Sequence, residues 1–443
     1  MRPEDGIFLA RCLSRRLRPS RAEMLEFQAR RLRALVEHAY RRVPFYRDLF
    51  DRHGLRPEDI RGLADLPRVP ITSRGDLQAA SPDRLVARGL NPQALVCKTT
   101  SGSSGEPLTI RRSAREVRAQ GAARLPAVLD VGRRPRDRGA IVTSLRASDP
   151  LERKRLLRAL RRVGLFREIR VNCRQPPEAI AQILEAYRPH VVSGLAGAIS
   201  RVAELVGGDP SRRLRPRLVT TAGEVLTRSM RAQIAEGLRT RVVDLYTSHE
   251  FNLIAWECEA GEGYHTCDMG VIVEVIRDGR PAAPGERGEM VVSGLHSFCM
   301  PFLRYRLGDL VTRGPDSCPC GQPFSVLRAI QGRMIDYFPL PDGRLVHPYE
   351  VVRALTDGLG PWVRQYQLTQ EREDRVVLRV APSRPLPPER LAALEQTLAG
   401  VLGPTVSCSV DVVTEIDLER NGKFRVSRSL VRSAYDRIDW DRV

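Results

Sequence analysis

The sequence predicts an α/β protein, with a large multi-subdomain N-terminal region of α/β and β structure and a small α+β C-terminal domain. The chain has 443 residues. A single hydrophobic core rarely grows beyond roughly 300 residues, so one large domain and one smaller domain are expected. Short β-rich runs alternate with helical runs between residues 140 and 246. This alternation is typical of a largely parallel sheet covered by helices.

A long amphipathic helix is predicted near the start of the chain. Ser20 and Glu23 have the spacing of a capping box, and apolar residues from Leu25 to Ala39 recur at helical intervals until Pro44 stops the pattern. In the alternating region that follows, the apolar runs predict strands at 140–143, 191–193, 218–221 and 242–246, and helices at 177–187 and 226–237.

The pattern changes after residue 270. Runs at 271–276 and 289–293, with a turn at Asp278-Gly279, predict antiparallel strands of a second subdomain. Near the C-terminus the pattern predicts strands at 365–370, 375–380 and 406–413 and a helix at 388–401. We therefore place the domain boundary at residue 333, which gives an N-terminal domain of residues 1–333 and a C-terminal domain of residues 334–443.

Composition and charge favour a folded, cytoplasmic protein. Hydrophobic residues make up 42% of the chain and charged residues 28%, close to globular averages. The N-terminus lacks the apolar run of a signal peptide, and no run approaches the ~18 residues of a membrane span. The net charge of +19 makes a nucleic-acid-binding protein an alternative. The arginines are spread along the whole chain, however, so we predict neither a nucleic acid nor a membrane as partner.

A loop rich in glycine and hydroxyl groups precedes a predicted strand at 108–110. Its sequence, Thr-Thr-Ser-Gly-Ser-Ser-Gly-Glu-Pro, occupies residues 99–107. Backbone N–H groups near glycine approach a phosphate closely, and hydroxyls add donors without bulk, so the loop suits a polyphosphate. It does not have the Gly-Lys-Ser/Thr ending of a Walker loop. On its own composition, a flexible linker is an equal alternative.

This loop resembles the phosphate-binding loop of the adenylate-forming superfamily, and five further motifs of that superfamily follow in the same order. Within the superfamily the chain resembles the phenylacetate-CoA ligase branch, with its capsule-biosynthesis and deazaflavin-adenylating relatives. Val43 to Arg47, Leu66-Pro67 and Thr72 to Leu77 support this placement. The five further motifs are Thr221-Ala222-Gly223-Glu224, Tyr246-Thr247-Ser248-His249-Glu250, Tyr305-Arg306-Leu307-Gly308-Asp309, Gly332-Arg333-Met334-Ile335-Asp336 and Arg420-Asn421-Gly422-Lys423.

The resemblance covers nearly the whole chain and implies an AMP-forming ligase with a mobile C-terminal domain. Such an enzyme activates a carboxylic acid with ATP and Mg²⁺ to an acyl-adenylate, then transfers the acyl group to a thiol. For this branch the acid is most often aromatic and the thiol is that of coenzyme A. Transfer to an amine, a hydroxyl or a carrier protein is the alternative, as is a nucleotidyl product.

The resemblance also assigns roles to individual residues. Glu250 would bind Mg²⁺, since a hard cation prefers carboxylate oxygen. Lys423 would be catalytic, because its flexible ammonium can reach both the carboxylate and the α-phosphate. It is one of only three lysines in a chain that otherwise uses arginine. The acid would lie near His249 and Gly194. The remaining ATP-binding residues would be Thr100, Ser101, Gly102, Ser103, Ser104 and Gly105 at the phosphates, Gly223, Glu224 and Tyr246 at adenine, and Asp309 and Arg333 at the ribose or phosphates.

The chain departs from the superfamily pattern at three of these positions. Thr247 stands where glycine is usual, His249 where serine or threonine is usual, and Ile335 where the hinge often carries an acid. The position of the hinge residue is therefore left open.

The cysteines predict a metal site that is independent of these motifs. Six residues separate Cys258 from His265, and Cys318-Pro319-Cys320-Gly321 forms a tight turn with two thiols. Four soft ligands suit tetrahedral zinc, so we predict that Cys258, His265, Cys318 and Cys320 hold a structural Zn²⁺. Cys267 is an alternative fourth ligand.

Overall fold

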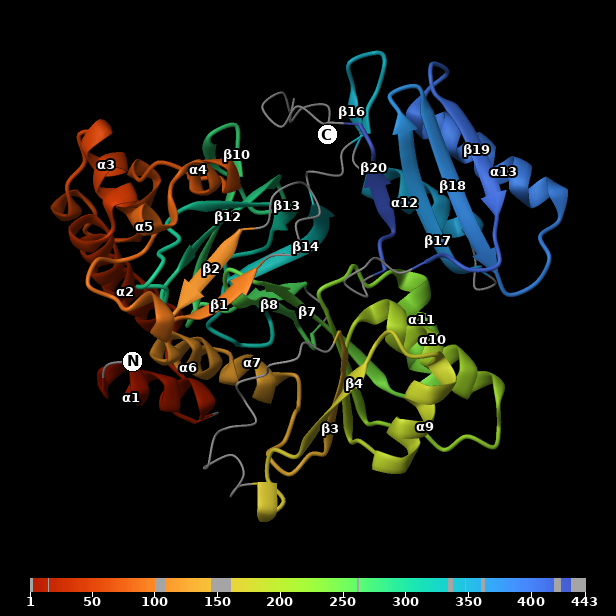
Figure 1. The fold of residues 1–443 in the computed structure, drawn as a ribbon, viewed down its shortest axis with the longest axis horizontal. Coiled ribbons are helices and arrows are strands. Elements are labelled where there is room, and N and C mark those ends of the chain that lie inside the picture. The colour runs from red at the N-terminus through yellow and green to blue at the C-terminus, as the bar shows by residue number, and fades with distance from the viewer. Residues whose placement is uncertain are drawn as a thin grey trace. The chain divides into compact units, whose positions relative to one another are not determined.

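The structure is a computed structural model of the chain, and it divides into two compact units (Figure 1). Unit 1 comprises residues 1–131 and 245–331, and unit 2 comprises residues 132–244 and 332–443. The domain boundary predicted at residue 333 stays a prediction. The structure describes residues 3–14, 16–99, 108–144, 161–260, 263–333, 338–346, 348–359, 363–417 and 424–431.

Unit 1 begins with helices, of which α2 (Arg21–Arg42) is the longest described. The predicted capping box is present: Ser20 Oγ accepts from the Glu23 N–H at 3.2 Å, and the Glu23 carboxylate accepts from the Ser20 N–H at 2.7 Å. The helix ends at Arg42 because Pro44 disfavours helical backbone at the residue before it. The other α-helices of this unit are α1 (Pro3–Leu13), α3 (Pro44–Arg52), α4 (Arg74–Ala79), α5 (Pro82–Leu85), α6 (Ala114–Ala123) and α7 (Leu125–Asp130), with short 3₁₀ turns at Pro57–Asp59, Leu63–Arg68 and Pro92–Ala94.

The strands of unit 1 are mainly antiparallel, as the sequence predicts for the region after residue 270. β1 (Val96–Thr99) and β2 (Thr109–Arg112) pair as a separate hairpin. The remaining strands follow the order β11-β10-β12-β13-β14-β9-β8 and continue to the end of β7. Their bounds are β7 (Arg241–Ser248), β8 (Asn252–Glu257), β9 (Tyr264–Thr266), β10 (Val271–Arg277), β11 (Arg280–Pro281), β12 (Arg287–Gly294), β13 (Tyr305–Arg313) and β14 (Val326–Arg333).

The N-terminal segments of unit 1 hold the chain that leads into β13. The Tyr46 hydroxyl donates to the carbonyl of Pro301 at 3.0 Å and accepts from the N–H of Leu303 at 3.1 Å. Thr72 exchanges backbone hydrogen bonds of 2.9 and 2.8 Å with Arg304 and Arg306. Two of the N-terminal segments that support the family resemblance therefore fix the position of the Tyr305 to Asp309 motif.

The first part of unit 2 is a parallel sheet with the order β4-β3-β5-β6, which confirms the predicted α/β alternation. Helices α9, α10 and α11 pack their apolar faces on these strands through one buried cluster that includes Val142, Val192, Ile199 and Ile234. The bounds are β3 (Gly139–Thr143), β4 (Glu168–Asn172), β5 (Val191–Gly194), β6 (Leu218–Ala222), α9 (Pro177–Tyr187), α10 (Ala196–Gly208) and α11 (Arg228–Leu238).

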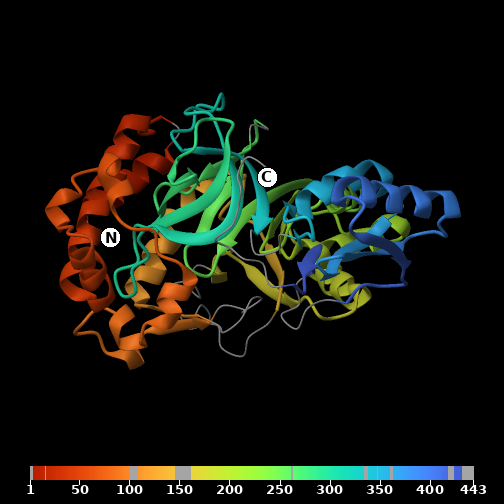
Figure 2. The same ribbon diagram turned by 90° about the horizontal axis from the view of Figure 1, so that it is seen from above.

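The second part of unit 2 is a four-stranded sheet in the order β19-β18-β17-β20. Helices α12 and α13 lie side by side on one face of it (Figures 1 and 2). Leu368, Leu378 and Leu398 are fully buried between the sheet and these helices. The bounds are β15 (Phe338–Pro339), β16 (Leu345–Val346), α12 (Pro348–Leu359), β17 (Val363–Arg372), β18 (Arg375–Pro382), α13 (Pro388–Leu402), β19 (Ser407–Val412) and β20 (Ser427–Ser429).

None of the helices that the structure describes combines the length and apolar character that a membrane crossing requires.

Candidate active site and metal centre

A bulge in β13 places Asp309. The pairing of β13 with β12 is regular up to Arg306 opposite Val291 and resumes with Leu310 opposite Glu289. Three residues of β13 therefore lie opposite the single residue Met290 of β12. Gly308, inside the bulge, has φ +84°, a backbone conformation that residues with a Cβ atom rarely adopt. The glycine of the motif is thus required by the backbone that projects Asp309.

Two residues predicted at the nucleotide meet at this bulge. The hydroxyl of Tyr246, at the end of β7, donates a hydrogen bond to Oδ2 of Asp309. Asp309 is buried, whereas Tyr246 keeps part of its surface accessible. The two motifs that carry these residues therefore meet at one place in the fold.

The turn between β7 and β8 carries Glu250 and His249, and a buried arginine holds it. Arg112, the last residue of β2, donates to the carbonyl of His249 and, at 2.6 Å, to the carbonyl of Glu250. Burial lowers the pKa of the Arg112 guanidinium, and the nearby charges of Glu250 and Glu116 oppose that change. Arg112 thus ties the strand that follows the 99–107 loop to the predicted Mg²⁺ ligand.

Arg112 was missed in the sequence because nothing local distinguishes it. It is one of many arginines, and its partners lie 137 and 138 positions further along the chain. Its one sequence clue is its place in the first strand after the phosphate-binding loop.

In unit 2, Gly194 ends β5 in a conformation that excludes other residues. Its φ is +146°, and a Cβ would lie 2.0 Å from the carbonyl oxygen of Val142 in the neighbouring strand. Close packing of two backbones therefore requires glycine here, whether or not the acid binds nearby.

The Glu224 carboxylate joins two parts of unit 2. One oxygen accepts from the N–H of Gly197 in the first turn of α10 at 2.8 Å, and the other accepts from the N–H of Phe424. The neighbouring Gly223 has φ +81°. Glu224 was predicted at adenine, and the structure adds a contact with the residue that directly follows Lys423.

The remaining predicted residues lie outside the described part of the chain. These are Thr100, Ser101, Gly102, Ser103, Ser104, Gly105 and Lys423. Arg333 is described by its backbone alone, as the last residue of β14.

A pair between the buried Glu289 and the partly exposed Arg306 lies beside the β13 bulge, and the Glu289 carboxyl predicts a pH dependence of stability. Glu289 Oε1 is 2.9 Å from Arg306 Nε. Burial raises the pKa of the Glu289 carboxyl to about 7, although Arg306 opposes the rise. The folded chain therefore holds a proton that the unfolded chain, with a pKa near 4.5, has released. We expect the free energy of unfolding to fall by about 3 kcal/mol as the pH rises from about 4.5 to about 7.

Urea denaturation at pH 5 and pH 8 measures this dependence. The Glu289→Gln variant should lose most of it, because glutamine does not titrate. Equal pH dependence in the two proteins would contradict the assignment.

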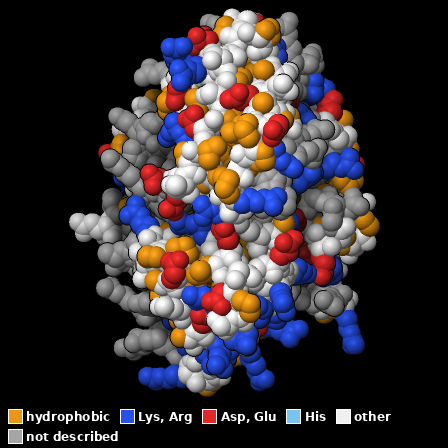
Figure 3. Space-filling model, turned by 90° about the vertical axis from the view of Figure 1, so that its right-hand side faces the viewer, with side chains coloured by type: hydrophobic (Ala, Val, Ile, Leu, Met, Phe, Trp, Pro, Cys, Tyr) orange, Lys and Arg blue, Asp and Glu red, His pale blue; other side chains and the backbone are white. Residues whose placement is uncertain are grey.

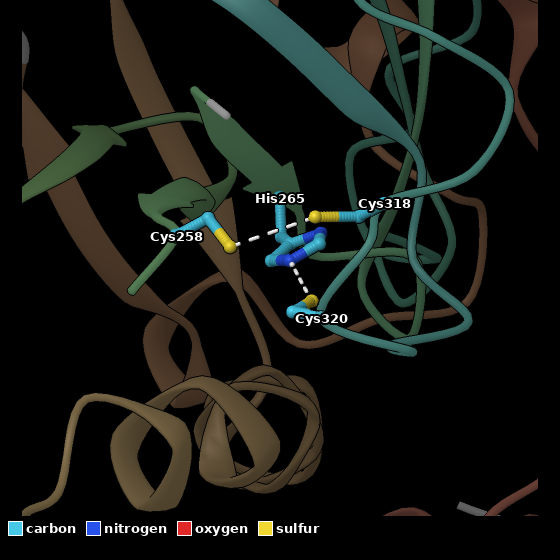
Figure 4. A group of neighbouring side chains, drawn as sticks. All are labelled: Cys258, His265, Cys318 and Cys320. Carbon is cyan, nitrogen blue, oxygen red and sulfur yellow. Dashed lines mark hydrogen bonds between the residues drawn. The ribbon is translucent and has the colours of Figure 1, made fainter. Parts of the chain in front are cut away.

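The predicted metal ligands converge in unit 1. Cys258 follows β8, His265 lies on β9, and Cys318 and Cys320 lie in the turn between β13 and β14 (Figure 4). Their four ligand atoms all lie within 4.8 Å of one another. The two sulfurs of Cys258 and Cys318 are 3.6 Å apart, and His265 Nε2 is 3.1 Å from the sulfur of Cys320.

These separations fit a tetrahedral zinc ion. Bond lengths of about 2.3 Å to sulfur and 2.0 Å to nitrogen give edges of about 3.8 Å between sulfurs and about 3.5 Å between sulfur and nitrogen. Burial raises the pKa of the Cys258 thiol to about 12 and lowers the pKa of His265. The imidazole is thus a neutral donor, whereas the buried thiol becomes a thiolate only with a cation beside it.

The structure decides between Cys320 and Cys267 as the fourth member of this cluster. Cys267 is fully buried elsewhere, and its thiol donates to the carbonyl of Ala123 at 3.5 Å. Around the cluster, Trp256 packs on the ring of His265, and its indole N–H donates to Asp130 at 2.8 Å. Gln322, two residues after Cys320, also donates to Asp130. The cluster therefore has an ordered shell of aromatic and polar groups.

Comparison with curated proteins finds relatives along most of the chain. It is 28% identical over 375 residues to the phenylacetate-coenzyme A ligase of Thermus thermophilus, which covers 82% of this chain and 83% of the relative. It is 27% identical over 304 residues to the enzyme of the same name from Escherichia coli, covering 65% and 67% of the two chains. No profile of a known protein family matches the chain.

Solved structures show the same fold. A 2-hydroxyisobutyryl-CoA ligase in the postadenylation state, in complex with an acyl-AMP, superposes with a TM-score of 0.75 at 21% identity over 92% of this chain and 90% of that chain. An anthranilate CoA ligase in complex with anthranoyl-AMP gives a TM-score of 0.55 at 16% identity, covering 83% and 73% of the two chains. The α/β fold class predicted from the sequence is thereby confirmed. Along most of its length, this protein is therefore similar in sequence to phenylacetate-coenzyme A ligases, and it has the fold of solved CoA ligases.

Proposed function

We propose that this protein is an AMP-forming ligase that activates a carboxylic acid with ATP and transfers the acyl group to the thiol of coenzyme A. The observation that carries the proposal is the hydrogen bond between Tyr246 and Asp309, which brings two ordered motifs of the superfamily into one site. The similarity to phenylacetate-coenzyme A ligases over most of the chain supports an aryl acid as the substrate.

The nucleotide would be held by groups of complementary chemistry. Asp309 accepts hydrogen bonds from the ribose hydroxyls, and its bond to Tyr246 orients the aromatic ring for contact with adenine. Gly223 and Glu224 would border the adenine, and the loop from Thr100 to Gly105 would donate to the phosphates. Arg333 would contact the ribose or phosphates.

Glu250 fits the role of Mg²⁺ ligand. Its carboxylate is a hard oxygen donor, and Arg112 fixes the backbone on which it stands. Bound Mg²⁺ would neutralise charge on the triphosphate. His249 and Gly194 would border the acid.

Two half-reactions follow from this arrangement. A carboxylate oxygen of the acid attacks the α-phosphorus of ATP, the bond to the bridging oxygen breaks, and pyrophosphate leaves. Lys423 donates hydrogen bonds to the oxygens on which negative charge grows. The sulfur of coenzyme A, as thiolate, then attacks the acyl carbonyl carbon and AMP leaves.

Rotation of a C-terminal lid, residues 334–443, about the segment 332–336 would separate the two steps. Transfer to an amine, a hydroxyl or a carrier protein is the alternative second step. The reaction would take place in the cytoplasm, where ATP and coenzyme A are available.

We also propose that the Cys258, His265, Cys318 and Cys320 cluster binds a structural Zn²⁺. All four positions of a tetrahedron would be filled by the chain, which leaves none for a substrate. The ion would tie the 318–321 turn to β8 and β9.

Nucleic acid is not favoured as a partner. On the face seen in Figure 3, Lys and Arg side chains are interspersed with Asp and Glu side chains. The arginines are also spread along the whole sequence rather than gathered in one segment.

Release of pyrophosphate from ATP and Mg²⁺ tests the proposal. A panel of aryl and aliphatic acids is assayed with and without coenzyme A. We expect an aryl acid to give slow release alone and faster release with coenzyme A, together with consumption of its thiol. Release that coenzyme A does not accelerate would favour another acceptor. No release with any acid, and no ATP binding in calorimetry, would contradict the proposal.

Arg112 is expected to act as a positioning residue for Glu250. Lysine at this position keeps the charge, but its single ammonium cannot hold both carbonyls in the fixed geometry of a guanidinium. We expect Arg112→Lys to lower the rate of adenylation roughly 10-fold to 100-fold and to raise the Mg²⁺ concentration that gives half-maximal rate. The matched control is Arg111→Lys, because Arg111 is the preceding residue of the same strand. An unchanged Mg²⁺ dependence in Arg112→Lys would leave Arg112 with a structural role only.

A further inference from the structure

A polar cavity lies on the C-terminal sheet, within unit 2. Among the side chains that the structure describes, none of those proposed for ATP, Mg²⁺, the acid or zinc lines it. Its volume is about 410 Å³, within the range of small-molecule sites. Gln367 on β17 and Arg379 on β18 are directly opposite each other in the sheet, and both line the cavity. The other charged lining residues are Glu415, Asp417, Arg425 and Arg428.

The lining carries more positive than negative charge. Three arginines face two carboxylates. One carboxylate, Glu415, is already paired at 2.9 Å with Arg201, which comes from α10 and does not line the cavity. Arg379 Nη2 lies 3.6 Å from Oε1 of Glu371, a half-buried residue of β17. The excess charge therefore favours an anion.

Hydrogen bonds orient several of these groups. Arg428 Nε donates to Thr369 Oγ1 at 3.3 Å. This bond uses one of the three guanidinium nitrogens. Gln367 Nε2 donates to the carbonyl of Arg425 at 2.9 Å. On the same face of β17, Gln365 is buried, and its Nε2 has no hydrogen-bond partner among the residues that the structure describes. Gln365 does not line the cavity, so the cationic donors that face it belong to Arg379, Arg425 and Arg428.

This combination suits a phosphorylated nucleoside. Guanidinium groups bind phosphate oxygens, whereas Asp417 and Glu415 accept from hydroxyl and amino groups. A cavity for a bare polyphosphate would not place two carboxylates beside the arginines. The residues proposed for ATP in unit 1, Tyr246, Asp309 and Glu250, are not among the lining residues. The other nucleoside-bearing substrate of the proposed reaction is coenzyme A.

We propose that this cavity binds the adenosine 3′-phosphate end of coenzyme A. The inference rests on the proposed function. Asp417 and Arg425 border the cavity and flank the segment that contains Lys423. The acceptor is therefore held by the same subdomain that supplies Lys423, which links acceptor binding to the position of the lid.

Dephospho-coenzyme A, which lacks only the 3′-phosphate, tests the inference. The kcat/KM of wild type is expected to be roughly 10-fold to 100-fold higher for coenzyme A than for dephospho-coenzyme A. Arg379→Gln and Arg428→Gln should each lower kcat/KM for coenzyme A about 10-fold and change it less than about 2-fold for dephospho-coenzyme A. Adenosine 3′,5′-bisphosphate should compete with coenzyme A in wild type.

Two controls separate this inference from the proposed function. ATP–pyrophosphate exchange reports acid activation alone and should stay within about 2-fold in both variants, which also shows that they fold. Arg384→Gln, an exposed arginine after β18 that does not line the cavity, should behave as wild type.

Two results would overturn the inference, provided that ATP–pyrophosphate exchange persists. One is an equal loss of kcat/KM for coenzyme A and dephospho-coenzyme A in the arginine variants. The other is a wild-type enzyme that does not prefer coenzyme A. Inhibition by the bisphosphate that excess coenzyme A does not relieve would assign the cavity to a regulatory nucleotide and also overturn it. Absence of exchange in wild type contradicts the proposed function instead.

Discussion

Replacing Lys423 with alanine is expected to lower the rate of acyl-adenylate formation by roughly 10²-fold to 10³-fold, with little change in the affinity for ATP. Negative charge grows on the α-phosphate and carboxylate oxygens as the acid attacks. The ammonium group would stabilise that charge most strongly in the transition state. The loss should therefore appear in kcat of ATP–pyrophosphate exchange rather than in KM for ATP.

The identity of the cation matters for this prediction. Lys423→Arg should not restore the rate, because a planar guanidinium is larger and less adaptable than an ammonium on a flexible stem. Lys154→Ala is the matched control, since it removes a lysine outside every motif of the superfamily. Exchange within about 3-fold of wild type in Lys423→Ala would remove Lys423 from the chemistry.

The thiol-transfer step gives an independent check. Supplied with synthetic acyl-adenylate and coenzyme A, Lys423→Ala should form thioester at close to the rate of wild type. In the proposed mechanism Lys423 acts only in the first half-reaction, so an equal loss in both steps would contradict that assignment.

Cys318→Ser is expected to lower the bound zinc from one equivalent to a small fraction and to lower Tm by roughly 6–20 °C. Loss of a structural metal costs about 3–5 kcal/mol of the free energy of unfolding, and each kcal/mol corresponds to roughly 2–4 °C in a unit of this size. Elemental analysis and thermal unfolding in reducing buffer measure the two effects.

The physical reason lies in the position of the cluster. β9 pairs with β14 through His265 and Val326, and β8 runs from the Glu250 turn to Cys258. Without the ion, the 318–321 turn and the end of β8 lose their common anchor. Adenylation is therefore expected to fall as well.

Cys267→Ala is the matched control for this prediction. Cys267 is equally buried but lies outside the cluster, so the variant should keep its zinc. A strong chelator should reproduce the Tm loss in wild type and have no further effect on Cys318→Ser. Wild-type protein without zinc, or a Cys318→Ser variant of unchanged Tm, would refute the metal site.

Local patterns in the sequence predicted much of the secondary structure and named most of the candidate residues. The capping box at Ser20 and Glu23 forms as predicted, since both partners lie within one helical turn. The turn at Asp278-Gly279 also forms, with φ of +49° and +75° at the two residues. The Cys258/His265 and Cys318/Cys320 pairs were also visible without a fold, because the members of each pair lie close together along the chain.

Contacts between distant segments were decided only by the tertiary structure. Arg112 and Glu250 are 138 positions apart, and no local pattern shows that the arginine side chain binds the backbone of Glu250. The sequence also left Cys267 and Cys320 as alternatives, and the packing of β9 against the 318–321 turn brings His265 to Cys320.

The sequence by itself determined the fold class, the order of the motifs and the chemistry that each motif can offer, because hydrophobic periodicity and turn chemistry act over a few residues. The tertiary structure decided which of these residues meet: Tyr246 with Asp309, and Arg112 with the Glu250 turn. It also produced the raised pKa of Glu289 and the arginine-lined cavity. These features depend on strand register, on the bulge at Gly308 and on burial, which are fixed only when the whole chain packs.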